Sequence, residues 1–243
     1  MTIPYSAYRH HPALRGLIRD PAESFFRDLD LTELDRRMAE RGVPQPWRRT
    51  DEEREAIRHQ FFAGQEGDVW VFAYGSLMWD PAILFDEVRR TRLPGYKRSM
   101  CLVDRRGARG TAEAPGLMAG LAEGDACEGL AFRIPAEIAD AETERLWRRE
   151  MMSHAYVPVL APAETRQGPV NVVAFVADPS SEMIETDLPH PLQVEYISQG
   201  EGMLGTSLEY LEGMLRQFHA LKVEDPELEQ LLCDVMARRA AAE

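Results

Sequence analysis

Cysteine is scarce in this chain, and the few that occur are isolated from one another. There are three among 243 residues, Cys101, Cys127 and Cys233, with no CxxC pair and no histidines beside them at metal-ligand spacing. An odd number of dispersed cysteines argues against a disulfide framework and against a thiolate zinc site. We therefore expect reduced thiols, a cytoplasmic protein and no bound metal.

Long hydrophobic runs are also missing. No segment approaches the ~20 consecutive apolar residues that a membrane-spanning helix needs. The first twenty residues, MTIPYSAYRHHPALRGLIRD, lack the apolar core of a signal peptide. The sequence therefore predicts neither a membrane partner nor secretion.

Positive charge is in deficit, with 28 Lys and Arg against 41 Asp and Glu and a formal net charge of -13. Such a charge repels polyanions, so we expect no nucleic-acid partner. The sequence also has no P-loop, no GxGxxG after a strand and no HExxH, so neither a nucleotide cofactor nor catalytic zinc is expected. An anionic small-molecule substrate would have to meet a local basic patch.

What is present is typical of a globular protein, with 44% hydrophobic and 28% charged residues. Residues 1–67 are rich in Arg and Glu and show helical signals. Thr50 with Glu53 fits a capping box, and LTELDRRMAERG has a helix stop at Gly42. We predict a helical N-terminal extension that serves as a scaffold on a main domain of residues 68–243.

The main domain begins with short strand-like runs separated by Gly, Pro and charged turns. Three amphipathic helical segments are inserted among these runs or follow them, and residues 180–192 are expected to form a loop. This order predicts an α+β fold with a small mixed sheet or barrel. The expected strands are 69–74, 97–103, 117–123, 128–134, 155–160 and 170–177, and the expected helices are 135–152, 206–221 and 225–240.

The segment VWVFAYGSLMWDPA combines an apolar strand ending at Tyr74 with a sharp turn at Gly75 and Ser76. A Gly-Ser turn at a strand end can leave consecutive backbone N–H groups pointing at one spot, where they can bind an anion or a developing oxyanion. A plain structural turn gives the same pattern, so both interpretations stand at this point.

The helical segment ending in LWRREM places an acidic residue where an apolar one is expected. Steps of three and four put Ala139, Thr143, Leu146 and Glu150 on one face. Burial raises the pKa of a carboxyl group, which suits it to accept and return a proton near neutral pH. The alternative is that Glu150 lies at a frayed helix end and pairs with a neighbouring Arg.

Three arginines, Arg105, Arg106 and Arg109, lie in the glycine-rich segment VDRRGARGTAEAPG between two expected strands. Arg can bind a carboxylate through two hydrogen bonds, so an anionic substrate could be held here. A solvated hairpin tip is the alternative. Ser76 is not in a GxSxG elbow, so a serine hydrolase would need a base from elsewhere; His154 is the only histidine close to the candidate helix.

Four segments together resemble the ChaC-like glutathione-specific γ-glutamylcyclotransferases, from about residue 68 to about residue 237. They occur in the order found in that family, which is more specific than any one of them. They are YGSLMWDPA starting at Tyr74, Arg109-Gly110-Thr111 with Pro115-Gly116, LWRREM followed by Tyr156, and EGMLGTSLEYLEGML.

The resemblance implies a γ-glutamylcyclotransferase-like fold, a small mixed β-barrel with surrounding helices, and no cofactor. It implies conversion of glutathione to 5-oxoproline and cysteinylglycine, with the substrate's α-amine attacking its own γ-carbonyl. Glu150 would be the general acid/base. The residues that the resemblance implies for substrate binding are Tyr74, Gly75, Ser76, Leu77, Arg109 and Tyr156.

Two places depart from the family pattern: Leu117 replaces a common Arg, and residues 152–155 read Met-Ser-His-Ala where glycine is frequent. A different γ-glutamyl amino acid or amine therefore stays open as substrate. A non-catalytic binding module of the same fold, and a hydrolase that uses Ser76 as nucleophile, are the other readings.

Overall fold

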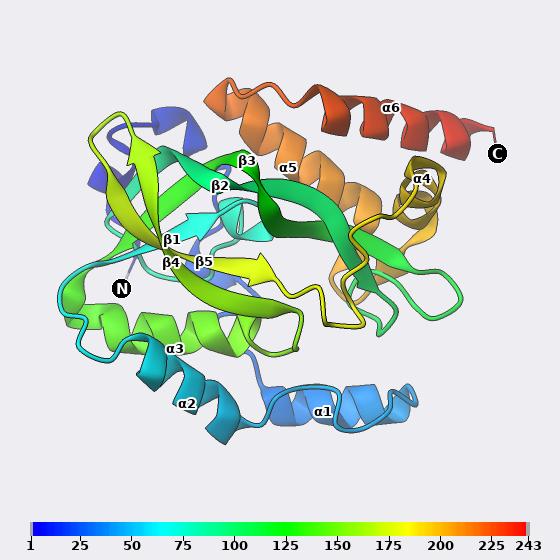
Figure 1. Cartoon of the computed structure of the whole chain (residues 1–243), viewed down its shortest axis with the longest axis horizontal. Coiled ribbons are helices and arrows are strands. Elements are labelled where there is room, and N and C mark those ends of the chain that lie inside the picture. Colours follow the sequence, from blue (N-terminus) through cyan, green and yellow to red (C-terminus); the bar gives the residue numbers. More distant parts are fainter. Residues whose placement is uncertain (1, 242–243) are drawn as a thin grey trace.

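The computed structural model describes residues 2–241, and its centre is a closed β-barrel (Figure 1). The strand order is β1-β3-β2-β4-β5, with β1 parallel to β5 and every other pair antiparallel. The predicted α+β fold with a small mixed barrel is confirmed. The strands are β1 (Val69–Ala73), β2 (Glu87–Asp104), β3 (Gly116–Ile134), β4 (Tyr156–Thr165) and β5 (Val170–Ala177).

The β-barrel lies between two apolar clusters, and strand β1 contributes side chains to both. Successive side chains of a strand point to opposite faces. Phe72 and Tyr74 belong to a cluster of buried residues contributed by the strands and their ends, whereas Val71 and Ala73 belong to the large cluster that includes residues of the surrounding helices. Because both faces of β1 are buried, its sequence is apolar throughout rather than alternating.

Strand β3 corrects the sequence prediction. We expected two strands, 117–123 and 128–134, but the structure has one continuous strand across both. The polar stretch between them stays in the ladder because β2 is equally long and pairs with β3 along its length. A register shift in β2 between Pro94 and Tyr96 absorbs the irregularity.

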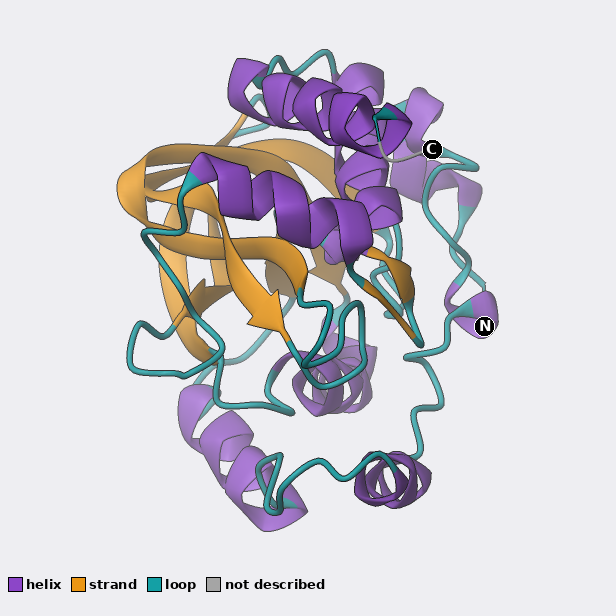
Figure 2. Ribbon diagram, turned by 90° about the vertical axis from the view of Figure 1, so that its right-hand side faces the viewer, coloured by secondary structure: helices purple, strands orange, loops and turns teal. Residues whose placement is uncertain are grey.

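Helices cover the barrel on two opposite sides, as Figures 1 and 2 show. The three predicted helices are confirmed. A helix at His190–Gln199 was not predicted, because its first three residues were assigned to a loop and its amphipathic pattern is weak. The helices of the main domain are α3 (Ala139–Glu150), α4 (His190–Gln199), α5 (Ser207–Leu221) and α6 (Pro226–Ala240), and a small hairpin pairs β6 (Glu201–Gly202) with β7 (Gly205–Thr206).

The N-terminal segment, residues 1–67, contains two helices, α1 (Leu31–Glu40) and α2 (Asp51–Phe61). The predicted capping box is present, because Thr50 and Glu53 each accept a hydrogen bond from the other's backbone N–H. Three short 3-10 turns (Tyr5–Tyr8, Pro12–Leu14 and Pro21–Glu23) and irregular chain make up much of the rest. Salt bridges Arg27–Glu142 and Arg58–Asp140 attach this segment to α3.

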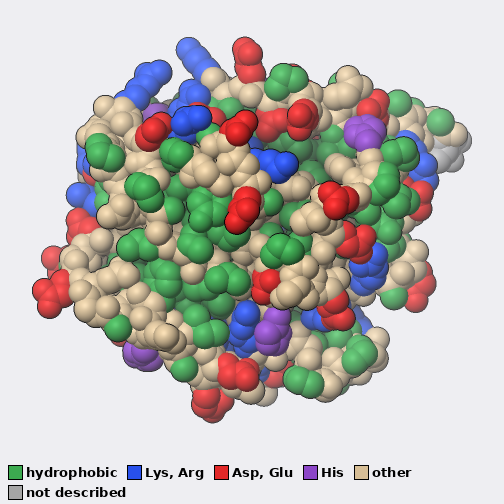
Figure 3. All heavy atoms as spheres, in the orientation of Figure 1, with side chains coloured by type: hydrophobic (Ala, Val, Ile, Leu, Met, Phe, Trp, Pro, Cys, Tyr) green, Lys and Arg blue, Asp and Glu red, His purple; other side chains and the backbone are tan. Residues whose placement is uncertain are grey.

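The face seen in Figure 3 has apolar side chains near its centre and charged ones toward its rim. On β4, Val157 and Leu160 are 44% and 48% exposed. Within residues 2–241, no helix combines the length and the apolar character that crossing a bilayer requires.

Candidate active site

The turn after β1 has an open backbone, as in one of the two interpretations that the sequence left standing. Ser76 begins a 3-10 turn that runs to Met78, and Met78 N–H donates to the Gly75 carbonyl. Within residues 2–241, no group accepts a hydrogen bond from the N–H of Ser76 or Leu77. The first N–H groups of a helical turn lack partners inside it, so both are free to donate to a bound group. The Leu77 side chain is buried, which leaves only its backbone to meet a substrate.

Gly75 is required by close packing rather than by its backbone angles. A Cβ at this position would collide with the hydroxyl oxygen of Tyr210, which comes from α5. The same hydroxyl accepts a hydrogen bond from Ala119 N–H of β3 at 3.3 Å. Tyr210 therefore brings α5, β3 and the Gly75 turn together at one point.

Glu150 is the last residue of α3, on the buried face that the helical spacing predicted. Thr143 and Leu146 of that face are almost completely buried, and the Glu150 side chain is 13% exposed. Burial raises the pKa of Glu150 above its ordinary value of 4.5, and the positive charge of Arg149 opposes part of this rise.

Arg149 connects this carboxylate with the turn after β1. Its Nε lies 2.9 Å from Glu150 Oε1, and its Nη2 donates to Ser76 Oγ at 2.9 Å. It also donates to the Asp80 carbonyl. One guanidinium group thus spans Glu150 and Ser76, which the sequence placed 74 positions apart. Both alternatives for Glu150 are met in part, since it is buried on the apolar face and paired with a neighbouring Arg.

Three tyrosines from three different elements surround the carboxyl group. Burial raises the pKa of Tyr74 and Tyr156 well above the usual value, and the nearby charge of Glu150 raises it further. Burial raises the pKa of Tyr210 to about 12. All three phenols therefore remain protonated at neutral pH and can donate hydrogen bonds. Tyr74 Oη already donates to the Phe175 carbonyl at 2.9 Å.

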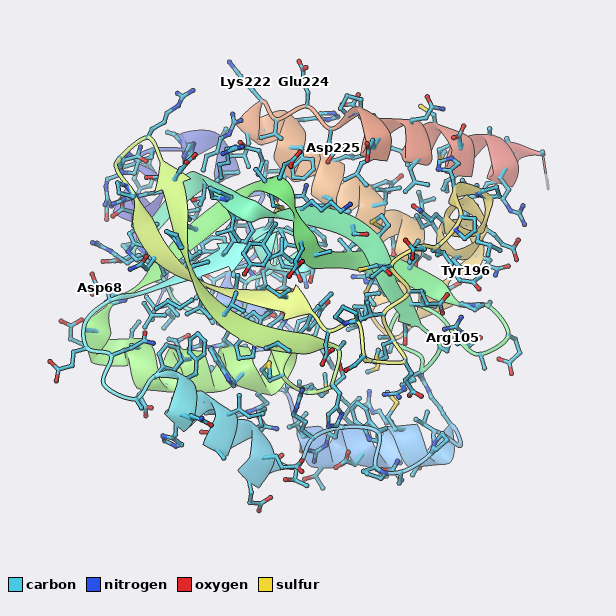
Figure 4. All side chains as sticks on the ribbon, viewed as in Figure 1. Asp68, Arg105, Tyr196, Lys222, Glu224 and Asp225 are labelled. Carbon is cyan, nitrogen blue, oxygen red and sulfur yellow. The ribbon has the colours of Figure 1, made fainter. Side chains whose placement is uncertain are left out.

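The three candidate arginines have different surroundings. Arg105 forms an ion pair with Glu185 at 2.8 Å and lies beside Tyr196 at the edge of the molecule (Figure 4). Arg106 forms an ion pair with Glu182. Arg105 matches the alternative of a solvated hairpin tip. Arg106 is partly buried against the N-terminal segment, where its Nη1 donates to the Trp47 carbonyl at 3.0 Å.

Arg109 is the arginine that lies at the site. Its guanidinium carbon is 5.3 Å from the centre of the Tyr210 ring, and Nη1 donates to the Thr206 carbonyl at 2.8 Å. Burial lowers its pKa. The Arg109 backbone is fixed because its N–H donates to Asp104 Oδ2 at 2.5 Å.

The structure thus brings Tyr74, Gly75, Ser76, Glu150 and Tyr156 together, with Arg109 reaching the same region through Tyr210. The sequence analysis missed Arg149 and Tyr210. Tyr210 shares a buried helix face with residues four and seven positions later, so it carries the same signal that singled out Glu150, a polar group on an apolar stripe. Arg149 carries no such signal, because its partners Ser76, Asp80 and Phe26 come from outside α3.

Among residues 2–241, no three or more His, Cys, Asp and Glu side chains are grouped so as to hold a metal ion. The cysteines are free thiols, with Cys101 and Cys127 buried and Cys233 exposed.

A family model described as ChaC-like protein matches residues 69–238, which include every residue of this site. The chain belongs to the ChaC-like protein family. Residues before Val69 lie outside the matched range.

Two known ChaC-like relatives illustrate the match. The Glutathione-specific gamma-glutamylcyclotransferase of Escherichia coli (strain K12) is 38% identical over 171 residues, which cover 70% of this chain and 74% of that protein. The Glutathione-specific gamma-glutamylcyclotransferase 1 of Danio rerio is 26% identical over 178 residues, which cover 71% of this chain and 89% of that protein.

A crystal structure of the yeast γ-glutamyl cyclotransferase specific to glutathione superposes with a TM-score of 0.65 at 18% identity, covering 72% of this chain and 98% of that chain. At this identity the match shows a shared fold, and it agrees with the barrel predicted for the ChaC-like family.

Proposed function

We propose that this ChaC-like protein is a glutathione-specific γ-glutamylcyclotransferase that converts glutathione to 5-oxoproline and cysteinylglycine. The E. coli relative with this name, 38% identical over most of the chain, supports the substrate. The observation that carries the chemistry is a buried Glu150, with a raised pKa, joined through one arginine to the turn at Ser76.

Glu150 is the general acid/base in this proposal. The carboxylate takes a proton from the α-amino group of the substrate, whose nitrogen then attacks the γ-carbonyl carbon of the same molecule. A carboxyl group with a raised pKa suits this transfer near neutral pH. After ring closure, protonated Glu150 gives the proton to the departing cysteinyl nitrogen, so the C–N bond of the amide breaks as the lactam forms.

The free N–H groups of Ser76 and Leu77 suit the negative charge that develops on the γ-carbonyl oxygen. A single donor of this kind contributes about 3 kcal/mol to transition-state stabilisation in enzymes where it has been removed. Because the reaction is intramolecular, the remaining task is to fold the substrate into its attack geometry. Tyr156 would line the site as a neutral donor, and Tyr74, whose proton goes to the Phe175 carbonyl, as a neutral acceptor. Arg109 would bind a substrate carboxylate.

The decisive assay incubates chelator-treated protein with glutathione and follows 5-oxoproline and cysteinylglycine by mass spectrometry. Equal amounts of both products are expected from wild type, and Glu150→Gln should lower turnover by at least about 100-fold, the lower range of a lost general base. Glu144→Gln is the matched control, because Glu144 lies on α3 in an ion pair with Arg148 and is 29% exposed. Turnover by Glu150→Gln at the wild-type rate would disprove this role.

The same chemistry on another γ-glutamyl compound is the second candidate, favoured by the departures at Leu117 and residues 152–155. A panel of γ-glutamyl amino acids and amines separates the two, since a glutathione-specific enzyme releases 5-oxoproline from glutathione alone. If none of the compounds in the panel, glutathione included, released 5-oxoproline, a non-catalytic binding module would be favoured.

A hydrolase with Ser76 as nucleophile is disfavoured by the hydrogen bonds. Ser76 Oγ accepts from Arg149, which is a donor and cannot act as a base. His154 is exposed. A serine-directed covalent probe that labelled Ser76 would overturn this conclusion. We also propose that the reaction occurs in the cytoplasm, where the free cysteines would stay reduced.

A further inference from the structure

The N-terminal segment, which lies outside the family match, contacts two of the chain segments that build the site. At the turn after β1, Arg19 N–H donates to the Trp79 carbonyl at 2.8 Å, and its guanidinium group binds Asp80 Oδ2 at 3.0 Å. At the loop after α3, Arg49 N–H donates to the Met152 carbonyl at 2.9 Å. The segment therefore contacts the chain a few residues beyond each end of the bridge that Arg149 makes between Ser76 and Glu150.

The side chain of Arg49 adds further contacts beyond Glu150. It donates to the carbonyls of Met151, at 3.3 Å, of Ser153, and of Tyr156, at 3.5 Å. Met151 is the C-cap of α3, and the final carbonyls of a helix have no partners within it. A cation is favourable at that end of a helix. Arg49 therefore caps α3 from outside and ties Glu150 to Tyr156.

Burial lowers the pKa of Arg49, and the charges of Glu53 and Asp178 offset only part of that effect. A long side chain that gives up water must gain strong hydrogen bonds in return. Arg49 gains these hydrogen bonds from the main-chain carbonyls of Met151, Ser153 and Tyr156.

Phe26 makes the second contact with the catalytic end of α3. Its ring centre lies 3.9 Å from the guanidinium carbon of Arg149, a cation–π distance. This ring covers the arginine that binds both Ser76 and Glu150. Phe26 thus packs against Arg149 and restricts its movement.

We propose that Arg49 and Phe26 are positioning residues that hold Glu150 in its reactive place, an inference that rests on the proposed function. Glu150 is the last residue of α3, and helix ends fray unless they are fixed. A displacement of about 1 Å in an active site can lower the rate about 100-fold. The N-terminal segment, expected from the sequence to be a scaffold, is in this proposal part of the catalytic apparatus.

The first test compares Arg49→Ala and Arg49→Lys with Arg36→Ala on glutathione. Arg36 lies in the same segment, but it is 58% exposed and pairs with Glu33 on the surface of α1. Arg49→Ala is expected to lower kcat about 100-fold with little change in KM, because the groups that bind substrate stay in place. Lys keeps the positive charge but lacks the several N–H donors of the guanidinium group, so the kcat of Arg49→Lys should lie between those of wild type and Arg49→Ala. The kcat of Arg36→Ala should stay within about twofold of wild type.

The second test follows the ionisation of Glu150 without turnover. In ¹³C-glutamate-labelled protein, the carboxyl signal lost in Glu150→Gln assigns the residue. The groups facing this carboxyl are Arg149, Tyr74, Tyr156 and Tyr210, and Arg49→Lys leaves all four unchanged. Water that enters on loosening should lower the titration midpoint in Arg49→Lys, toward the ordinary value. Phe26→Leu should also move the midpoint, because it frees Arg149, whose positive charge opposes part of the rise in the pKa of Glu150.

Each outcome decides the proposal. Loss of kcat in both folded variants supports it, with a lowered midpoint in Arg49→Lys and a moved midpoint in Phe26→Leu, even if Arg49→Ala does not fold. An unchanged midpoint overturns it, whether kcat is retained or falls only with the folded fraction measured by circular dichroism. If wild type does not turn over glutathione, the proposed function fails, and the midpoint alone still reports whether Arg49 and Phe26 fix Glu150.

Discussion

At Gly75, hydrogen is the only side chain that the hydroxyl of Tyr210 leaves room for. The next residues supply the free N–H groups, so a shift of the chain here moves the proposed oxyanion site. The sequence identified the turn from its Gly-Ser pair, but it did not show that Tyr210, on a helix more than 130 positions later, packs against this turn. Partners from distant elements are what a local pattern cannot reveal.

Gly75→Ala should therefore lower both stability and activity. The added methyl group collides with Tyr210 Oη, and overpacking of this kind costs about 1 to 3 kcal/mol. Tyr210→Phe alone also lowers stability, because Ala119 N–H loses its acceptor. Gly75→Ala/Tyr210→Phe should lose less than the sum of the two single variants, because the collision is gone and the next ring atom lies 3.6 Å from the Cβ position. Thermal unfolding of the single and double variants measures the coupling. Additive losses would show that the collision is not the cause.

The elements that carry the site were predicted unevenly. Helix α5 and its start were clear from composition, and the capping box of Thr206 with Glu209 is present. The long β3 was divided in two, because a polar stretch reads as a turn unless the equally long partner β2 is known. Helix α4 was missed, because its residues show little amphipathic pattern.

Thr206→Ala tests whether the start of α5 supports Arg109. Loss of an N-cap side chain costs about 1 kcal/mol, and Arg109 Nη1 binds the Thr206 carbonyl. We expect a lower unfolding temperature together with a higher KM for glutathione and an unchanged kcat. Asp30→Ala removes the comparable N-cap of α1, which makes no such contact with Arg109. It should lower stability without changing KM, and an equal rise in KM for both would contradict the prediction.

Folding of the whole molecule buries the carboxyl group of Glu150, and burial favours its protonated form. The pKa of Glu150 is raised in the folded state, so the folded protein binds this proton more tightly than the unfolded chain. The resulting stability is fully present below the unfolded value of about 4.5 and is lost as pH rises through the folded value. An ionised Glu150 at neutral pH thus lowers the free energy of unfolding.

Glu150→Gln should therefore be more stable than wild type at neutral pH, although it is inactive. The amide stays neutral and its oxygen can still accept from Arg149 Nε. Unfolding temperatures of both proteins should converge near pH 4 and separate as pH rises, with the variant higher. A difference that did not change with pH would mean that ionisation of Glu150 is not its origin.

At the molecular scale the barrel was predictable, because four ordered motifs resemble one family and the apolar runs have strand length. The attachment of residues 1–67 was not, because each contact needs a partner from a distant element, as in the salt bridges Arg27–Glu142 and Arg58–Asp140 and the carbonyls that Arg49 binds. From the sequence alone, a residue that makes such a buried contact cannot be told from one that is exposed to solvent.

The external cap that Arg49 provides has an evolutionary consequence. Its partners are the main-chain carbonyls of the short connection between Glu150 and Tyr156, where this chain reads Met-Ser-His-Ala at 152–155. The two segments should therefore change together: relatives without the N-terminal segment need a connection that satisfies its own carbonyls, and relatives that keep it should keep the arginine as well. We therefore expect position 49 to covary with positions 151–155 among ChaC-like proteins.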